Sequence, residues 1–493
     1  MSLRILSKDF AFYGLLDFLQ RSLGILLVPI YTRVLSQASY GDLDLIVTVG
    51  SALTVLVDLQ FAAAFGRLYL EHRRDADGPR FVGTTILTRA AVGTVLAALF
   101  LSVGFAGGLE TRFIPSFAGN AAAWVIVALS VPVTFVYDIL LVQTQMLRSK
   151  KGFFVGAFGN ALLATILSIV FTVALDLGIF GVVLGQFIGR LVVTLVLLMG
   201  MRKEIAFEYR SAILTELSSY ALPLVPGWWV AFSSAYVSRF FIYGGQGAQQ
   251  NAILAITMKL AALIGMFCVA FRTAWQPLAI SYIGEDGGEA FYIQSLRVFT
   301  AAGLFSVFML ALLSRPALAI LAPPSYGAAA DYVPYFLVAM IIGELDVNLQ
   351  LGNQISKKTH WMSIAATLGL VVNLAVLISW TSRLGIYAAG AGLLASVIMK
   401  VSVTYLSAQR NYKIHYDRKS LIVFAFGCVS LLLLAVARST AALGEAVVVG
   451  MVLVLGLALP WIALGRRERD LFRKATAVGV SWVFGGRGHA DAG

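Results

Sequence analysis

Long apolar runs are the feature of this 493-residue sequence that most limits its fold. Apolar types make up 59% of the residues and charged types 13%, whereas a soluble chain has about 45–50% and about 25%. A run of about 20 apolar residues spans a bilayer as an α-helix. Because backbone groups in hydrocarbon must be hydrogen-bonded internally, the runs predict an all-α polytopic membrane protein.

Fourteen runs are long enough to be transmembrane helices, and twelve is the main alternative count. The fourteen lie at 12–34, 42–65, 85–107, 121–144, 152–175, 178–200, 217–243, 249–279, 291–313, 331–352, 361–381, 386–407, 420–438 and 444–464. The first run carries Asp17 and Arg21 and ends in no small-residue cleavage site. We therefore interpret it as an anchored first helix rather than a cleaved signal.

The basic residues predict the orientation of these helices. With the N-terminus inside, 26 of the 37 Lys and Arg residues, Arg89 and Arg297 among them, fall on the cytoplasmic side and five on the other. Basic residues are retained on the cytoplasmic face during insertion. We expect an even number of spans with both termini cytoplasmic, so the net charge of +12 sets topology and does not indicate nucleic-acid binding.

Short strings recur at nearly one offset and indicate an internal repeat. The string SKK at 149–151 recurs at 356–358, and LGI followed by an aromatic residue at 177–180 recurs at 384–387, both at an offset of 207. An offset of six helices gives both copies the same orientation. We predict two parallel-repeat six-helix lobes around a central cavity. The predicted domains are an N-lobe (1–210), a C-lobe (211–410), helices 13–14 (411–465) and a basic cytoplasmic tail (466–493).

Basic residues inside the apolar runs are candidates for lining the cavity, because intramembrane charge is usually functional. We select Arg21, with Asp17 one helical turn away to orient it, and Lys259, Arg239 and Arg272. The alternatives are an internal Asp17–Arg21 ion pair, snorkelling of Arg239 and interfacial anchoring of Arg272. Two further basic residues, Arg190 and Lys400, have a weaker case for facing the cavity.

Four further acids fall inside apolar runs: Asp58, Asp138, Glu344 and Asp346. Asp138 and Asp346 are related by an offset of 208 and lie near the middle of their predicted helices. A desolvated carboxylate there can exchange a proton or hold a sodium ion, which would couple transport to an ion gradient. The alternative is that the acids hold cavity arginines in place.

Other site chemistries find little support. Cys268 and Cys428 lie in apolar runs, and the four histidines do not cluster, so we expect no disulfide, metal or other cofactor. The longest external loop, roughly 314–330, is too short for a catalytic domain. We expect no enzymatic activity.

A stretch near the N-terminus carries a family resemblance. PIYTRVLSQASYGDLDLI at 29–46, together with AWQPLAI at 274–280 and PPSYGAAADYVP at 323–334, resembles bacterial polysaccharide exporters and O-antigen (Wzx-type) flippases. The family's pattern is matched by Tyr31, Thr32, Arg33, Leu35, Ser36, Tyr40 and Gly41, and the resemblance covers about residues 8 to 410. The implied superfamily is the multidrug/oligosaccharidyl-lipid/polysaccharide (MOP) group, with two six-helix lobes around a cationic cavity.

The resemblance implies a flippase that moves a polyprenyl-diphosphate-linked oligosaccharide across the bacterial cytoplasmic (inner) membrane by alternating access. The fixed cations would stabilise the diphosphate on its path. Implied partners are the lipid-linked oligosaccharide, membrane lipids and a polysaccharide polymerase or assembly machinery. The alternatives are a multidrug or small-molecule cation antiporter of the same superfamily and a lipid II flippase.

Overall fold

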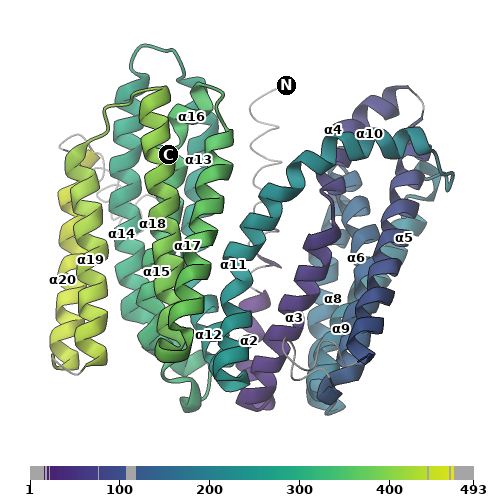
Figure 1. Cartoon of the computed structure of the whole chain (residues 1–493), viewed down its shortest axis with the longest axis horizontal. Coiled ribbons are helices and arrows are strands. Elements are labelled where there is room, and N and C mark those ends of the chain that lie inside the picture. The colour runs from purple at the N-terminus through teal and green to yellow at the C-terminus, as the bar shows by residue number, and fades with distance from the viewer. Residues whose placement is uncertain are drawn as a thin grey trace, which may run out of the picture. The chain divides into compact units, whose positions relative to one another are not determined.

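The computed structural model describes residues 16, 19–20, 23–75, 77–106, 118–440, 443–465 and 468–470. All regular elements in these ranges are helical (Figure 1). The α-helices of the first half are α2 (Val28–Val34), α3 (Gln37–Val57), α4 (Phe61–Arg74), α5 (Gly78–Phe105), α6 (Ala121–Met146), α7 (Lys150–Phe154), α8 (Asn160–Ile169), α9 (Gly178–Gly200) and α10 (Ser211–Ala221). Those that follow are α11 (Val225–Gln246), α12 (Ala248–Ala261), α13 (Ile264–Ser281), α14 (Gly288–Leu321), α15 (Ala329–Leu349), α16 (Leu351–Ile355), α17 (His360–Leu384), α18 (Ile386–Asn411), α19 (Arg418–Ser439) and α20 (Glu445–Ala463).

Eleven helical segments in the described ranges are long and apolar enough to cross a membrane. The predicted all-α membrane fold is confirmed, while the predicted count of fourteen is not. The first predicted span lies partly outside the described residues, and its described part is the short apolar helix Leu23–Val34. Helices α3 and α11 have spanning length, with 21 and 22 residues, but are not among the eleven.

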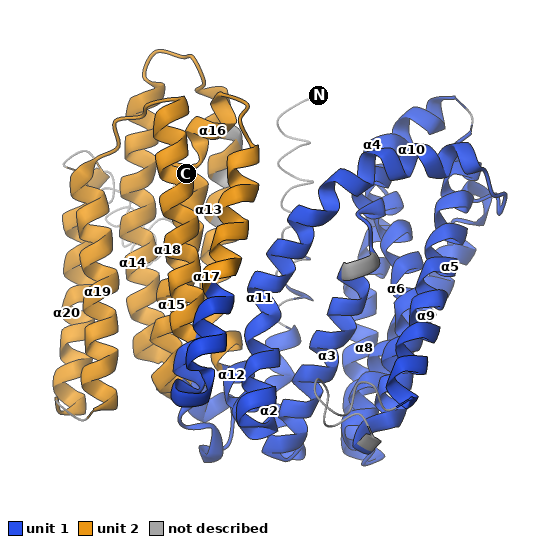
Figure 2. Cartoon of the chain, viewed as in Figure 1, with its two compact units in different colours: residues 1–256, 318–329, 373–389 blue, residues 257–317, 330–372, 390–493 orange. Residues whose placement is uncertain are grey.

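The chain forms two compact units (Figure 2). Unit 1 comprises residues 1–256, 318–329 and 373–389, and unit 2 comprises 257–317, 330–372 and 390–493. Five helices contribute residues to both units: α12, α14, α15 (through Ala329 alone), α17 and α18. The lobe boundaries at 210 and 410 stay a prediction.

Small residues bring helices together in unit 1. Gly181, Gly185 and Gly189 are four residues apart on α9, so they lie along one face. A Cβ on Gly185 would stand 2.3 Å from the backbone nitrogen of Ser168, and one on Gly189 would stand 2.7 Å from Ala164. Close backbone approach through small residues is how helices associate in lipid, where apolar burial adds little. This face therefore fixes α9 against α8.

Apolar side chains of α4, α5 and α10 form a buried cluster in unit 1. Phe65 of α4 stacks on Tyr69 and on Phe81 of α5, with ring centroids 5.1 Å and 5.4 Å apart, and all three are buried. The short helix α10 buries Ile213 and Leu217 in the same cluster. This packing holds the segment before α11 against α4 and α5.

Unit 2 is also joined through small residues and one partly buried ion pair. Cβ atoms on Gly427 of α19 and Gly456 of α20 would stand 2.7 Å and 2.8 Å from side chains of α14. The Arg297 Nε of α14 donates to Asp417 Oδ2 at 2.9 Å, just before α19. Helices α19 and α20, side by side in Figure 1, are thereby held on α14.

The repeated LGI strings share one backbone conformation. Gly178 and Gly385, at the offset of 207, both have φ +54, in the left-handed region that glycine adopts without steric cost. Gly178 is the first residue of the long helix α9, and Gly385 directly precedes the long helix α18. The sequence repeat therefore corresponds to a repeated turn.

Arg89 is a correction to the predicted topology. We counted it among the cytoplasmic basic residues, but it lies in the middle of α5 and is 2% exposed. Its guanidinium pairs with Asp58, and its Nε donates to the Phe135 carbonyl at 3.1 Å. The ion pair compensates the charge at this depth, so Arg89 carries no information about which side faces the cytoplasm.

Candidate functional site

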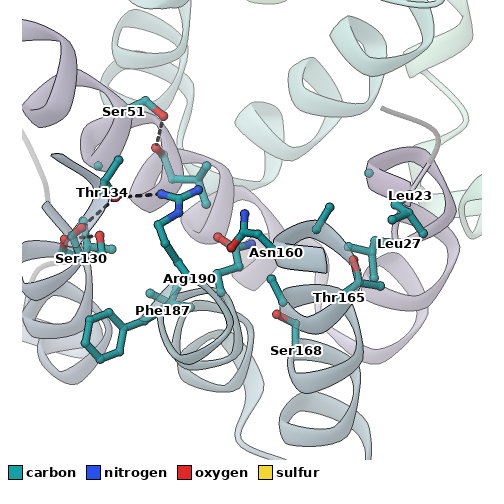
Figure 3. Close-up of a pocket in the computed structure, with 18 of the residues that line it drawn as sticks. Leu23, Leu27, Ser51, Ser130, Thr134, Asn160, Thr165, Ser168, Phe187 and Arg190 are labelled. Carbon is teal, nitrogen blue, oxygen red and sulfur yellow. Dashed lines mark hydrogen bonds between the residues drawn. The ribbon is translucent and has the colours of Figure 1, made fainter. Parts of the chain in front are cut away.

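A cavity of about 350 Å³ lies within unit 1 (Figure 3). Its walls come from the segment before α2 and from α3, α6, α8 and α9. The polar side chains in its lining are Gln20, Ser51, Thr54, Ser130, Thr134, Asn160, Thr165, Ser168, Gln186 and Arg190. One cation, three amides and six hydroxyls line it, and none of its described lining residues is acidic. We call it the N-unit pocket.

Two π-helical turns, Val155–Gly159 and Val170–Ala174, frame the wall made by α8. A π-turn inserts one residue and re-aims the side chains that follow it. Carbonyls in the first turn accept side-chain hydrogen bonds: Gly156 from the Tyr137 hydroxyl at 2.9 Å and Ala157 from Gln20 Nε2 at 2.6 Å. The turns thus hold Asn160 and Ser168, both buried, at the pocket wall.

Arg190 of α9 is the only basic side chain in the described lining of the pocket. Its Nη1 donates to Thr134 Oγ1 at 2.8 Å, and its guanidinium carbon lies 5.5 Å from the centroid of the Tyr137 ring. Its Nε is buried without a hydrogen-bond partner in the described part of the chain. Close packing of Gly189 on α8 fixes the backbone beside it. Arg190 is therefore held in place and keeps donor capacity.

This lining suits a cargo that is anionic and rich in hydroxyl groups. A guanidinium presents several fixed donors that match phosphate oxygens. Amide and hydroxyl side chains both donate and accept, as sugar hydroxyls do. A cationic cargo would need carboxylates, which the described lining does not provide. Arg190 was only a weak candidate from the sequence, because the pattern of an almost wholly apolar helix does not show which face meets a cavity.

Arg21 and Asp17, the predicted pair on the first helix, lie outside the described residues. Their neighbour Gln20 lines the N-unit pocket, as do Leu23 and Gly24. The first helix therefore contributes to the pocket, while the roles of Arg21 and Asp17 stay predictions.

Arg239, a predicted phosphate contact, forms an ion pair. Its Nε donates to Asp44 Oδ2 of α3 at 2.9 Å, and the two side chains are 11% and 13% exposed. Asn251 Nδ2 donates to the Gly41 carbonyl at 2.9 Å and reaches Asp44 at 3.3 Å. The pairing joins the two sequence halves inside unit 1. It also occupies the guanidinium that we expected to be available to a diphosphate.

The residues of the predicted family pattern take part in the same contact zone. Thr32 Oγ1 and Arg33 Nη2 donate to the Leu321 and Ile320 carbonyls, each at 2.9 Å. These carbonyls end α14, where no helical N–H is available to them. The Tyr40 ring also meets the Tyr326 ring edge-on at 6.0 Å. The pattern thus caps a helix of the second half. We name the contacts of residues 32–44 with 239–251 and 320–326 the junction.

The predicted acids Asp58 and Asp138 meet at Arg89. The Asp138 carboxylate lies 3.7 Å from the Arg89 guanidinium, which also pairs with Asp58. The side chains of Asp58 and Asp138 are 18% and 39% exposed. This arrangement matches the alternative in which acids hold arginines, but it leaves Asp138 accessible for a coupling role.

In unit 2, Asp346 Oδ2 lies 3.0 Å from the Lys400 ammonium, and Glu344 pairs with Arg272. Two predicted site residues, Arg272 and Glu344, are therefore brought together by the fold. Asp346 is buried, whereas Lys259 is exposed near the end of α12. Lys400, like Arg190, belongs to the last predicted helix of its sequence half, and its pairing with Asp346 was not predicted from the sequence.

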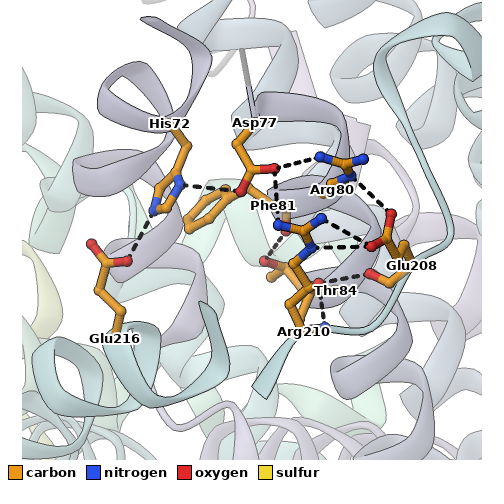
Figure 4. Close-up of polar contacts among 9 residues, drawn as sticks. His72, Asp77, Arg80, Phe81, Thr84, Glu208, Arg210 and Glu216 are labelled. Atoms are coloured by element: carbon orange, nitrogen blue, oxygen red, sulfur yellow. Dashed lines mark hydrogen bonds and ion pairs between the residues drawn. The ribbon is translucent and has the colours of Figure 1, made fainter. Parts of the chain in front are cut away.

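A polar network fastens the segment that links the halves (Figure 4). Glu208 receives hydrogen bonds from Arg80 at 2.8 Å and from Arg210 at 3.0 Å, and these bonds hold the pKa of its carboxyl below the usual range. His72 contacts Glu216 of α10 at 2.9 Å and stacks on Phe81. The network ties residues 206–216 to α4 and α5.

Known proteins share this fold. The inward closed conformation of the lipid II flippase MurJ aligns with a TM-score of 0.72 and 16% identity, over 93% of this chain and 99% of that chain. An inward-facing multidrug resistance MATE family transporter of the MOP superfamily aligns with a TM-score of 0.63 and 14% identity, over 79% and 94%. No curated protein sequence matches.

The family is shown by the sequence itself. Residues 6–283, more than half of the chain, match the model of a family described as polysaccharide biosynthesis protein. The matched region contains the pattern that builds the junction and every lining residue of the N-unit pocket. The chain belongs to the polysaccharide biosynthesis protein family and has the membrane fold of MOP-superfamily transporters.

Proposed function

We propose that this protein is a flippase that translocates a polyprenyl-diphosphate-linked oligosaccharide across the bacterial cytoplasmic membrane by alternating access. The observation that carries the proposal is the N-unit pocket, in which Arg190 stands among amides and hydroxyls and no described lining residue is acidic. Uncompensated charge in the membrane costs several kcal/mol or more. A path for a diphosphate therefore needs fixed cations and hydrogen-bonding groups.

The proposed cycle separates and re-forms the junction. Alternating access requires contacts that hold one side closed and can be exchanged for others when that side opens. The Arg239–Asp44 pair joins the two halves by one ion pair, and the bonds from Thr32 and Arg33 to α14 end on backbone carbonyls. Opening this side would free Arg239 to receive the diphosphate. Arg239 would then have the phosphate-binding role predicted for it.

Ion coupling belongs to the same proposal. Asp138 and Asp346 each face a basic partner, Arg89 or Lys400, at 3.7 Å and 3.0 Å. Protonation of Asp346 would weaken its pair and release Lys400 for the anionic cargo, whereas protonation of Asp138 would leave Arg89 paired with Asp58. The two acids can be compared by measuring transport with and without an imposed proton or sodium gradient in Asp138→Asn and Asp346→Asn.

A multidrug or cation antiporter is the second candidate, favoured by the fold shared with MATE transporters. The cation in the N-unit pocket argues against it, because a cationic drug would meet Arg190. A lipid II flippase remains an alternative, since lipid II carries the same diphosphate group as the proposed polyprenyl-diphosphate-linked oligosaccharide. We further propose cytoplasmic termini, no enzymatic step and a polymerase as downstream partner.

Complementation of polysaccharide export in cells that lack the gene tests the proposal. We expect Arg190→Ala to lower export at least tenfold and Arg190→Lys to restore part of it. Arg21→Ala and Lys259→Ala are expected to reduce export, the latter less. Arg383→Ala, at an exposed arginine near the end of α17, is the control and should export normally. Normal export by Arg190→Ala at wild-type abundance would contradict the role of the pocket.

A further inference from the structure

A second pocket, of about 210 Å³, lies in unit 2 where α17 begins and α18 ends. Its lining residues are Trp361, Val403, Leu406, Ser407, Arg410 and Asn411. Both helices are candidate membrane spans, so their ends mark one membrane boundary. We call this cavity the α17–α18 pocket.

Hydrogen bonds make its polar end a built structure. Asn353, which is fully buried, donates to Ser407 Oγ at 2.8 Å and accepts from Asn411 Nδ2 at 2.8 Å. Asn411 Oδ1 in turn accepts from the Lys358 ammonium at 3.0 Å. The chain therefore holds one ammonium beside the pocket and a guanidinium, that of Arg410, in its lining.

The Arg410 guanidinium makes no hydrogen bond or ion pair within the described ranges. Acids on neighbouring elements are engaged elsewhere: Glu289 contacts His415 at 2.7 Å, and Asp417 pairs with Arg297. None of the six lining residues is acidic. The pocket is thus a local positive site without a counter-charge from its own surroundings.

Its other wall is apolar and turned outward. Leu406, one helical turn before Arg410, is 58% exposed, and Val403 continues the same wall toward the middle of α18. Trp361 stands in the first turn of α17, the depth at which tryptophan is enriched in membrane proteins. An apolar wall leading to a basic, hydrogen-bonding end matches a lipid with an anionic headgroup.

We propose that the α17–α18 pocket binds an acidic phospholipid of the cytoplasmic leaflet. The headgroup phosphate contacts Arg410 and Lys358, and an acyl chain lies along Val403 and Leu406. Lys357 and Lys358, at this boundary, are among the 26 basic residues that the charge bias predicts to lie on the cytoplasmic side. The proposal does not depend on what the protein transports.

Native mass spectrometry of the purified full-length protein tests the site. The probes are phosphatidylglycerol and phosphatidylcholine with identical acyl chains. We expect wild type to prefer phosphatidylglycerol, and Arg410→Gln to weaken its binding about fivefold, since one cation near a membrane surface contributes about 1 kcal/mol. Arg410→Lys should keep the preference. Arg418→Gln removes an exposed basic residue outside the pocket and should change binding less than twofold.

Three results would overturn the proposal. The first is equal binding of both lipids by wild type, and the second is equal phosphatidylglycerol binding by Arg410→Gln and Arg418→Gln. The third is displacement of phosphatidylglycerol by millimolar inorganic phosphate, which would make the ligand free phosphate. If Arg410→Gln does not fold, two other variants decide the outcome. Trp361→Leu should weaken the binding of both lipids by the same factor, and Arg410→Lys should keep the preference for phosphatidylglycerol.

Discussion

The close approach of α3 and α12 at Gly41 allows a sharp prediction about the junction. A Cβ on Gly41 would stand 1.8 Å from the Ala248 carbonyl oxygen and 2.6 Å from its carbon. Both are backbone atoms, so no side-chain rotation relieves the clash. Gly41→Ala must therefore separate the helix ends and lengthen the bond from Asn251 Nδ2 to the Gly41 carbonyl, now 2.9 Å.

The cost has two parts. Overpacking by one methyl group costs about 1–3 kcal/mol, and loss of a buried hydrogen bond adds about 1 kcal/mol. A total of about 2–4 kcal/mol corresponds to a Tm lower by roughly 5–10 °C in a domain of this size. Thermal unfolding in detergent, followed by tryptophan fluorescence, measures it. Gly244→Ala on α11 is the control, because nothing lies within 4 Å of its Cβ. Equal Tm values for the two variants would refute the reasoning.

Three further predictions concern charges. Arg89→Met should lower the free energy of unfolding by about 3 kcal/mol, because Asp58 loses its partner; adding Asp58→Asn should recover part of this loss in the same unfolding assay. At Asp417, burial opposes ionisation, but hydrogen bonds from Arg297 and Ser420 hold its pKa below the ordinary 3.8. Its stabilising effect is therefore present above pH 3.8 and is lost as pH falls through the lowered pKa, so Asp417→Asn should lower Tm at pH 7 but converge with wild type in acid. Export by Asp346→Asn should lose any gradient dependence if Asp346 couples transport, whereas the matched Asp331→Asn, at a partly exposed acid in the first turn of α15, should keep it.

Hydropathy and the repeat could be derived from the sequence because both are local signals. Apolar runs predicted the spanning helices, and the LGI strings marked turns that need a left-handed glycine. The family pattern at 29–46 was recognisable in the sequence, but the contacts that its residues make could not be predicted. That Arg33 caps α14 depends on a contact between residues almost 290 positions apart.

The candidate pocket was harder to predict for a physical reason. In a soluble protein the apolar stripe of a helix identifies its buried face. Helix α9 is apolar on nearly all sides, so the sequence does not show which way Arg190 points. The π-turns around α8 have no sequence signature and shift its side chains toward the cavity. Arg89 was misplaced for a related reason: only the fold brings Asp58 and the Phe135 carbonyl to it.

Transport by purified protein in proteoliposomes tests the central claim most directly. The substrate is a fluorescent polyprenyl-diphosphate-linked glycan, and the comparison is a fluorescent lipophilic cation of similar size. The account predicts that wild type translocates the glycan lipid, that Arg190→Ala does so at least tenfold more slowly and Arg383→Ala normally, and that the cation is not moved. Transport of the cation alone, or glycan-lipid transport unchanged in Arg190→Ala, would contradict it.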